Sequence, residues 1–131
     1  MRQTFKKGEK LKSKKLIEQL FERGKRLKSF PIQLVYLEID HKSDFLIQAG
    51  FSVPKKRFKK AVDRNRIKRL MREAYRLHKH KLPNITDLDT KKHIFMFIYM
   101  GSQMENYTTI EAQFLIILKN IKQKLVKNLE S

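Results

Sequence analysis

Residues 55–81 hold thirteen lysines and arginines but only two acids, Asp63 and Glu73. Guanidinium and ammonium groups pair with phosphate oxygens through charge and hydrogen bonds. The chemistry that this segment predicts is therefore the binding of a polyphosphate, such as a nucleic acid, rather than the making or breaking of bonds.

Residues 61–77 have helical periodicity, which sorts their side chains onto two faces. One stripe is apolar and consists of Ile67, Leu70, Met71, Ala74 and Leu77. The opposite face carries Asn65, Lys68, Arg69, Arg72 and Arg76, and is flanked by Arg64 and Arg66. Because an amphipathic helix packs its apolar stripe on a core, the basic face should form a stiff exposed rod, about 30 Å long for twenty residues.

A charged helix face is often only a solvated surface. Solvated faces usually mix acids with bases, because opposite charges four residues apart attract and like charges repel. Lys68 and Arg72, and likewise Arg72 and Arg76, are like-charged pairs at this spacing. We therefore favour a nucleic-acid-binding face over a merely solvated one, because a bound nucleic acid would relieve the repulsion between these like charges.

The composition is that of a basic protein of ordinary domain size. The chain has 131 residues and a net charge of +18, which favours nucleic acid or an anionic membrane surface as partner. A second basic segment, residues 1–28, holds eleven bases and three acids, whereas the remaining segments are nearly neutral. The charge is thus patterned on one domain, predicted over 1–131, with residues 1–12 as a mobile basic arm.

Several kinds of site are disfavoured by the residues present. The chain has no cysteine, which excludes disulfides and thiolate metal sites. His78 and His80 fall on different helix faces, and Asp87 and Asp89 lie in a polar loop, so we expect no metal site. No apolar run reaches 18 residues and no signal-like apolar segment follows the N-terminus, so we expect a cytoplasmic protein without a membrane partner.

Apolar stripes at helical spacing predict helices over 13–23, from 61 to about 82, and over 109–127. Ser13 is a predicted N-cap, and Gly24 a natural C-terminal end. Pro83 stops the middle helix, and Thr108 with Glu111 matches a capping box for the last one.

Strands are predicted over 25–30, 32–39, 45–53 and 94–100. The first is a short edge strand, and the next two read as a hairpin joined by a polar loop of about five residues. The last is almost wholly apolar, as in a buried central strand. A strand, a helix and a further strand predict a crossover connection, with the helices on one face of a small mixed sheet and Tyr36 or its neighbours on the open face.

Two motifs carry a resemblance to a known family. They are Gly50-Phe51-Ser52-Val53-Pro54-Lys55-Lys56 and the run from Ala61 to Glu73, which contains Arg64-Asn65-Arg66 followed by Ile67-Lys68-Arg69 and Arg72. The chain resembles the protein subunit of bacterial ribonuclease P. The motif match covers about 50–75, and the order and lengths of the elements agree over about 11–125.

The resemblance implies an α/β sandwich of order αβββαβα with a left-handed crossover, similar to a domain of ribosomal proteins. It implies the protein subunit of an endoribonuclease whose RNA subunit removes the 5′ leader of precursor tRNA. The partners implied are the ribonuclease P RNA and precursor tRNA, with no obligate protein partner. The cofactor implied is Mg²⁺, held mainly by the RNA, and no catalytic residue is expected in this chain.

The resemblance also implies two sets of binding residues. The set facing the RNA subunit is Lys55, Lys56, Arg64, Asn65, Arg66, Lys68, Arg69 and Arg72, and the basic helix face adds Arg76. The set lining a cleft for the single-stranded leader is Ile17, Phe21 and Tyr36. Ile17 stands where the family often has an aromatic residue, so base stacking at that position would be lost.

Two other functions fit parts of the sequence. A ribosomal or RNA-chaperone protein would have the same composition and would bind RNA without taking part in cleavage. A DNA-binding domain would insert the basic helix into a major groove, where Asn and Arg side chains read adenine and guanine.

Overall fold

The order of the elements is αβββαβα, as the sequence predicts. A computed structural model describes residues 5–82 and 91–130, with side chains up to 125. The elements are α1 (Lys14–Arg23), β1 (Lys25–Ser29), β2 (Ile32–Glu38), β3 (Ile47–Ser52), α2 (Ala61–His78), β4 (His93–Tyr99) and α3 (Tyr107–Glu130), with short 3-10 turns at Lys7–Glu9 and Lys79–Lys81.

The strands form a mixed sheet in the order β1-β2-β4-β3. The pairs β1–β2 and β2–β4 are antiparallel, whereas β3 and β4 are parallel and are joined through α2. Strand β4 is central and all seven of its residues are buried, because strands flank both of its edges and helices cover both of its faces. The predicted central strand and crossover connection are confirmed.

The predicted hairpin between 32–39 and 45–53 is wrong. Strand β4 lies between these two segments, and β2 forms its hairpin with β1 instead, where Ser29 lies opposite Ile32. The turn holds Phe30 and Pro31, joined by a cis peptide bond. Two alternating segments separated by a polar loop satisfy the local hairpin pattern, but the apolar β4 provides a better-buried partner for both of them.

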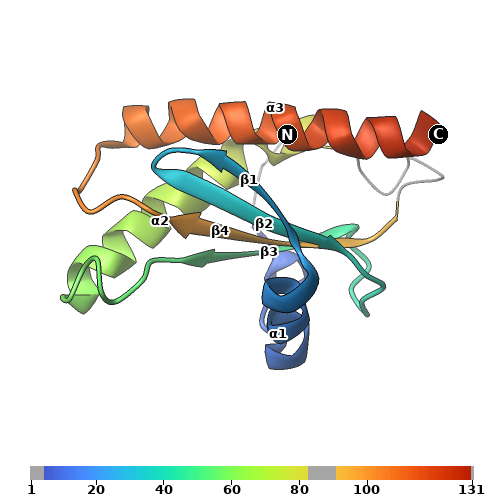
Figure 1. Ribbon diagram of the computed structural model, residues 1–131, viewed down its shortest axis with the longest axis horizontal. Coiled ribbons are helices and arrows are strands. Elements are labelled where there is room, and N and C mark those ends of the chain that lie inside the picture. Colours follow the sequence, from blue (N-terminus) through green and yellow to red (C-terminus); the bar gives the residue numbers. More distant parts are fainter. Residues whose placement is uncertain (1–4, 83–90, 131) are drawn as a thin grey trace.

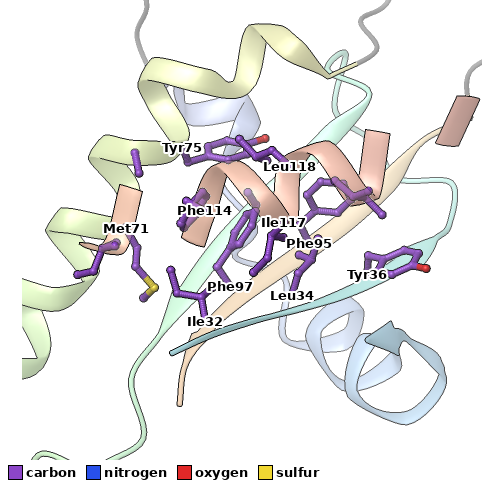
Figure 2. Packing of buried hydrophobic residues seen from close by; sticks show 14 of the residues in the cluster. Ile32, Leu34, Tyr36, Met71, Tyr75, Phe95, Phe97, Phe114, Ile117 and Leu118 are labelled. Atoms are coloured by element: carbon purple, nitrogen blue, oxygen red, sulfur yellow. The ribbon is translucent and has the colours of Figure 1, made fainter. Parts of the chain in front are cut away.

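The main core lies between the sheet and the helices α2 and α3 (Figure 2). Aromatic rings dominate it: Phe97 stacks on Phe114 with ring centroids 4.4 Å apart, and Tyr75 packs on Phe97 at 5.5 Å. Such ring pairs add about 0.5–1.5 kcal/mol each to the free energy of burial. The core thus fixes the orientation of α2 against the sheet.

Helix α1 covers the other face of the sheet, so the prediction of all helices on one face is wrong. Leu20 of α1 is fully buried and belongs to a second cluster with Val35, Ile94 and Met96. Figure 1 shows α1 on the side of the sheet opposite α2 and α3. Consequently β2 is buried on both faces, from Ile32 to Tyr36, and not on one face only as we predicted.

Residues 5–12, which belong to the predicted mobile arm, pack on the folded domain. The ring of Phe5 lies edge-on to Phe51 and Tyr75, with centroids 5.8 and 5.7 Å away. Leu11 is buried on the α1 side of the sheet, and its N–H donates to the carbonyl of Ala49, 2.9 Å away. The segment therefore runs along the outer edge of β3 and contacts both faces of the sheet.

The helix ends confirm some predicted caps and correct others. Ser13 accepts a hydrogen bond from the N–H of Leu16, as predicted. At α3 the cap is Asn106, which accepts from the N–H of Thr109 at 2.9 Å, so the capping box at Thr108 is wrong. At α2 Asp63 is a first-turn acid, and Lys60 at the N-cap makes no capping hydrogen bond through its side chain. The predicted stop at Pro83 and the loop with Asp87 and Asp89 lie outside the described residues.

Candidate nucleic-acid interface

Helix α2 presents a continuous basic surface. Its buried side is Ile67, Met71, Ala74 and Tyr75, which pack in the main core. Its exposed polar residues are Asn65, Arg66, Arg69 and Arg72, and we call these four residues the α2 ridge. Because the opposite side of the helix is anchored in the core, the ridge is held at a fixed position and direction.

The loop before α2 extends the positive surface. Lys55 and Lys56 are exposed there, and so are Lys59 and Lys60. Arg64 stabilises this loop: its Nη1 donates to the carbonyls of Phe58 at 2.7 Å and Lys59 at 2.8 Å. The structure thus gives Arg64 a structural contact within the chain, in addition to its predicted position beside the ridge.

Two residues of the predicted set are less available than the ridge. Arg76 forms an ion pair with Glu73, three residues earlier on α2, which lowers the pKa of Glu73 and raises the pKa of Arg76. Lys68 is half-buried. Within the predicted set, Lys55, Lys56 and the α2 ridge are therefore exposed. Arg64 and Arg76 also bind other groups of the protein, and Lys68 is half-buried.

The two leader-binding residues predicted on α1 lie on the same side of that helix. Ile17 and Phe21 are four residues apart, so their side chains are neighbours. Ile17 is half-buried and packs against the cluster under α1, whereas Phe21 is 42% exposed. Phe21 therefore offers a ring face to solvent beside the α1 side of the sheet.

Tyr36 does not join them, and its prediction as a lining residue of the same cleft is corrected by the structure. Tyr36 packs in the main core under α2 and α3, with only 8% of its surface exposed (Figure 2). Successive residues of a strand point to opposite faces, so Val35 takes the place facing α1. Our prediction depended on which face was open, and the alternation of β2 alone does not decide this.

Three polar residues on the α1 side of the sheet were missed by sequence reasoning. Arg26 of β1 lies opposite Val35, and Lys28 lies opposite Gln33, so all three polar side chains share the face of Val35. Arg26 Nη1 donates to Gln33 Oε1 at 3.2 Å. The signal was the alternation within residues 25–29, where Arg26 and Lys28 share one face of a predicted edge strand.

Within residues 5–82 and 91–130 no group of three or more metal-binding side chains comes together. Nor does any helix described there have the length and hydropathy to span a membrane. The most strongly shifted pKa values belong to tyrosines in helix contacts: burial, and then a hydrogen bond to Glu111, raises the pKa of Tyr107 to about 12.

Comparison with known proteins gives a consistent result. Residues 5–122 match the family described as Ribonuclease P. The ribonuclease P protein component of Porphyromonas gingivalis is 33% identical over 127 residues, covering 93% of this chain and 92% of the relative. That of Chlorobaculum tepidum is 34% identical over 124 residues, covering 88% and 80%.

Solved structures share the fold. The RNase P protein of Staphylococcus aureus matches with a TM-score of 0.67 at 22% identity, covering 87% of this chain and 95% of the other. The protein from Thermotoga maritima gives a TM-score of 0.68 at 22% identity, with coverage of 86% and 96%.

Proposed function

This chain belongs to the ribonuclease P protein family, and we propose that the α2 ridge is the surface through which it binds the RNA subunit. As a member of the family it is the protein component of an endoribonuclease that matures the 5′ end of tRNA. Its partners are accordingly the ribonuclease P RNA and precursor tRNA.

One observation carries the assignment of the ridge. Arg66, Arg69 and Arg72 are exposed in a row on a helix whose other side is buried. The acid nearest along the helix to Arg72, Glu73, is occupied by Arg76. The planar guanidinium group of arginine binds phosphate through paired hydrogen bonds. Arginines in a row on a rigid helix lose little conformational entropy on binding. We therefore assign Lys55, Lys56 and the ridge to the RNA backbone, with Arg64 holding the loop.

We assign the 5′ leader to the α1 side of the sheet. Leaders of different precursors differ in sequence, so their site should hold the backbone by charge and the bases by stacking. Phe21 supplies an exposed ring, Arg26 and Lys28 supply charge, and Ile17 supplies an apolar contact. Tyr36 has no place in this assignment, because it lies on the opposite face of the sheet.

We propose further that the Mg²⁺ ions are held mainly by the RNA subunit, so that this chain supports cleavage by binding and orienting RNA. A cytoplasmic location is part of the same proposal. Reconstitution with the RNA subunit and a precursor tRNA at low magnesium tests whether this chain supports cleavage. The chain should stimulate 5′ cleavage. No stimulation would contradict the proposal, and the ribosomal and DNA-binding alternatives predict that result.

The ridge is tested by charge removal. The triple variant Arg66→Ala, Arg69→Ala, Arg72→Ala should bind the RNA subunit more weakly. The slope of log affinity against log salt should flatten by about 0.7–0.9 for each phosphate that the variant no longer binds. Equilibrium binding at several salt concentrations measures both effects.

A matched control removes the same charge elsewhere. Lys119, Lys122 and Lys124 are exposed on α3, so their triple alanine variant also lowers the net charge by three. It should change the salt slope much less. Equal slopes in the two variants would mean that RNA responds only to net charge, which contradicts a ridge-specific contact.

A further inference from the structure

A small hollow opens at the end of the sheet. It lies where the β1–β2 turn, the end of β4 and the loop after β3 meet. Its volume is about 290 Å³, and it is lined by Lys28, Phe30, Ile32, Arg57 and Met100. This is near the lower end, about 300 Å³, of the usual range for small-ligand sites. We call it the Phe30 hollow.

The cationic side of the hollow contains an unsatisfied donor. Arg57 is half-buried, and its Nε is buried without a hydrogen-bond partner among the residues that the structure describes. The backbone N–H of Arg57 donates to the carbonyl of Pro54 at 3.1 Å, which fixes the start of the side chain. A buried guanidinium nitrogen without an acceptor is unfavourable, and pairing of the Arg57 guanidinium with an anionic ligand in the hollow that it lines would offset that cost.

Lys28 adds a second positive charge on the same hollow, and none of its lining residues is an acid. Lys28 is exposed on β1, so its ammonium group is free to follow a ligand. The two cations together favour a phosphate over a neutral ligand.

The other side of the hollow is apolar and contains a flat ring. Phe30 is 74% exposed, although Pro31 and Ile32, which follow it, are buried. A single exposed phenylalanine is ordinary on a protein surface. Here, however, Phe30 lines the same hollow as Met100 and Arg57. A ligand that matches all of these features has a flat ring system joined to a phosphate.

We propose that the Phe30 hollow binds one unstacked nucleotide of single-stranded RNA, with its base against Phe30 and its phosphate on the guanidinium group of Arg57. The inference rests on the proposed function and adds a nucleotide site separate from the α2 ridge. The 5′ leader and an unpaired segment of the RNA subunit offer the same chemistry. Two binding measurements distinguish these sources.

The experiment uses the full chain with Phe30→Leu, Phe30→Trp and Arg57→Gln. One arm measures the affinity of the holoenzyme for precursor tRNA with a long leader and with a one-nucleotide leader. The other arm measures the affinity of the protein for the RNA subunit. Phe30→Leu should weaken binding about tenfold in one arm, since it keeps an apolar side chain but cannot stack on a base. Phe30→Trp should stay within about twofold of wild type.

Arg57→Gln should weaken binding in the same measurement as Phe30→Leu. The double variant should lose less affinity than the product of the two single-variant losses, because both side chains contact one nucleotide. A loss confined to the long leader assigns the nucleotide to the precursor. A loss in RNA-subunit binding assigns it to that RNA.

The matched control is Ile116→Ala, which truncates another exposed apolar side chain, on α3 and 46% exposed. Unfolding midpoints confirm that each variant is folded. If Phe30→Leu binds like wild type in both arms, or is weakened no more than Ile116→Ala, the nucleotide site is overturned. The proposed function would still stand in that case, provided that the wild-type chain stimulates cleavage.

Discussion

At the scale of single residues, the most buried ion pair among the described residues joins Glu9 to Lys79. One carboxylate oxygen of Glu9 accepts from Lys79 Nζ, and the other accepts from the N–H of Lys6 at 2.8 Å. The side chains are only 9% and 18% exposed. The pair therefore joins the N-terminal segment to the end of α2, beside the ring of Phe5.

Glu9→Gln keeps the shape of this side chain but removes its charge. We expect a loss of about 1–3 kcal/mol in the free energy of unfolding, because the half-buried Lys79 ammonium loses its carboxylate. Denaturant unfolding of the variant and of wild type measures the difference.

The exposed pair of Glu38 and Lys91 is the matched control, since its side chains are 48% and 72% exposed. Glu38→Gln should change the free energy of unfolding by less than about 1 kcal/mol, as for other surface pairs. Similar losses from the two variants would refute the structural role assigned to Glu9.

Helical periodicity could predict that Asn65, Arg69 and Arg72 face solvent. Lys68 and Arg76, predicted on the same face, are half-buried. Periodicity could not predict that Arg64 would donate to two loop carbonyls, because this depends on the path of the chain before the helix.

At the scale of elements, α3 begins at a cap, Asn106, that differs from the predicted Thr108. Asn106→Ala should destabilise the protein by about 1 kcal/mol, because the N–H of Thr109 loses its acceptor. Thr108→Ala is the control and should cost less than about 0.5 kcal/mol. Thermal unfolding of the two variants tests this order, and the reverse order would favour the capping box.

The capping-box prediction failed because Glu111 has other partners. Its carboxylate accepts from Tyr107 OH at 3.1 Å and bonds His78 Nε2 at 2.8 Å. The bond to His78 contributes most to lowering the pKa of Glu111. A side chain that joins two helices is not visible in a four-residue pattern.

The strands illustrate the same limit at a longer range. Length and composition could predict β4 as buried and central, and local patterns located β1, β2 and β3. The sequence predicted the crossover from β3 through α2 to β4, but the place of β4 between β2 and β3 was beyond local patterns, because β4 is separated from both strands by the whole of α2. Local patterns also could not show which face of the sheet α1 covers. For this reason they could not place Tyr36, which lies on the other face.

At the scale of the whole molecule, two buried histidines make stability depend on pH. Burial is the main cause that lowers the pKa of His41 and of His93. Lys92 also lowers the pKa of His41 while Asp40 raises it, and Glu38 raises the pKa of His93. Both imidazoles are thus held in the neutral form in the folded protein.

The sign follows from proton binding. In the unfolded chain these histidines titrate near pH 6.5, so below that pH the unfolded state binds more protons than the folded state. Their contribution is complete above about pH 7 and is lost as the pH falls through 6.5 towards the lowered values. The slope is at most about 1.4 kcal/mol per pH unit for each histidine.

Denaturant unfolding between pH 7 and pH 5 measures this slope. His93→Gln should flatten it, and His80→Gln, at an exposed position, is the control and should leave it nearly unchanged. If the slope of His93→Gln equals that of wild type, burial of this imidazole does not control the acid response.

Residues 5–12 cover part of an outer edge of the sheet, and an uncovered strand edge can pair with a second chain. On one outer edge of the sheet, β1 exposes Lys25, Arg26 and Lys28, which repel an approaching basic strand. On the other, Lys10 bridges to Ala49 and Leu11 donates to the same residue, so part of β3 is already occupied. Proteolytic cleavage after Lys6 or Lys7 would loosen that cover and release Phe5 from the rings of Phe51 and Tyr75, so an apolar strand edge would become available for aggregation.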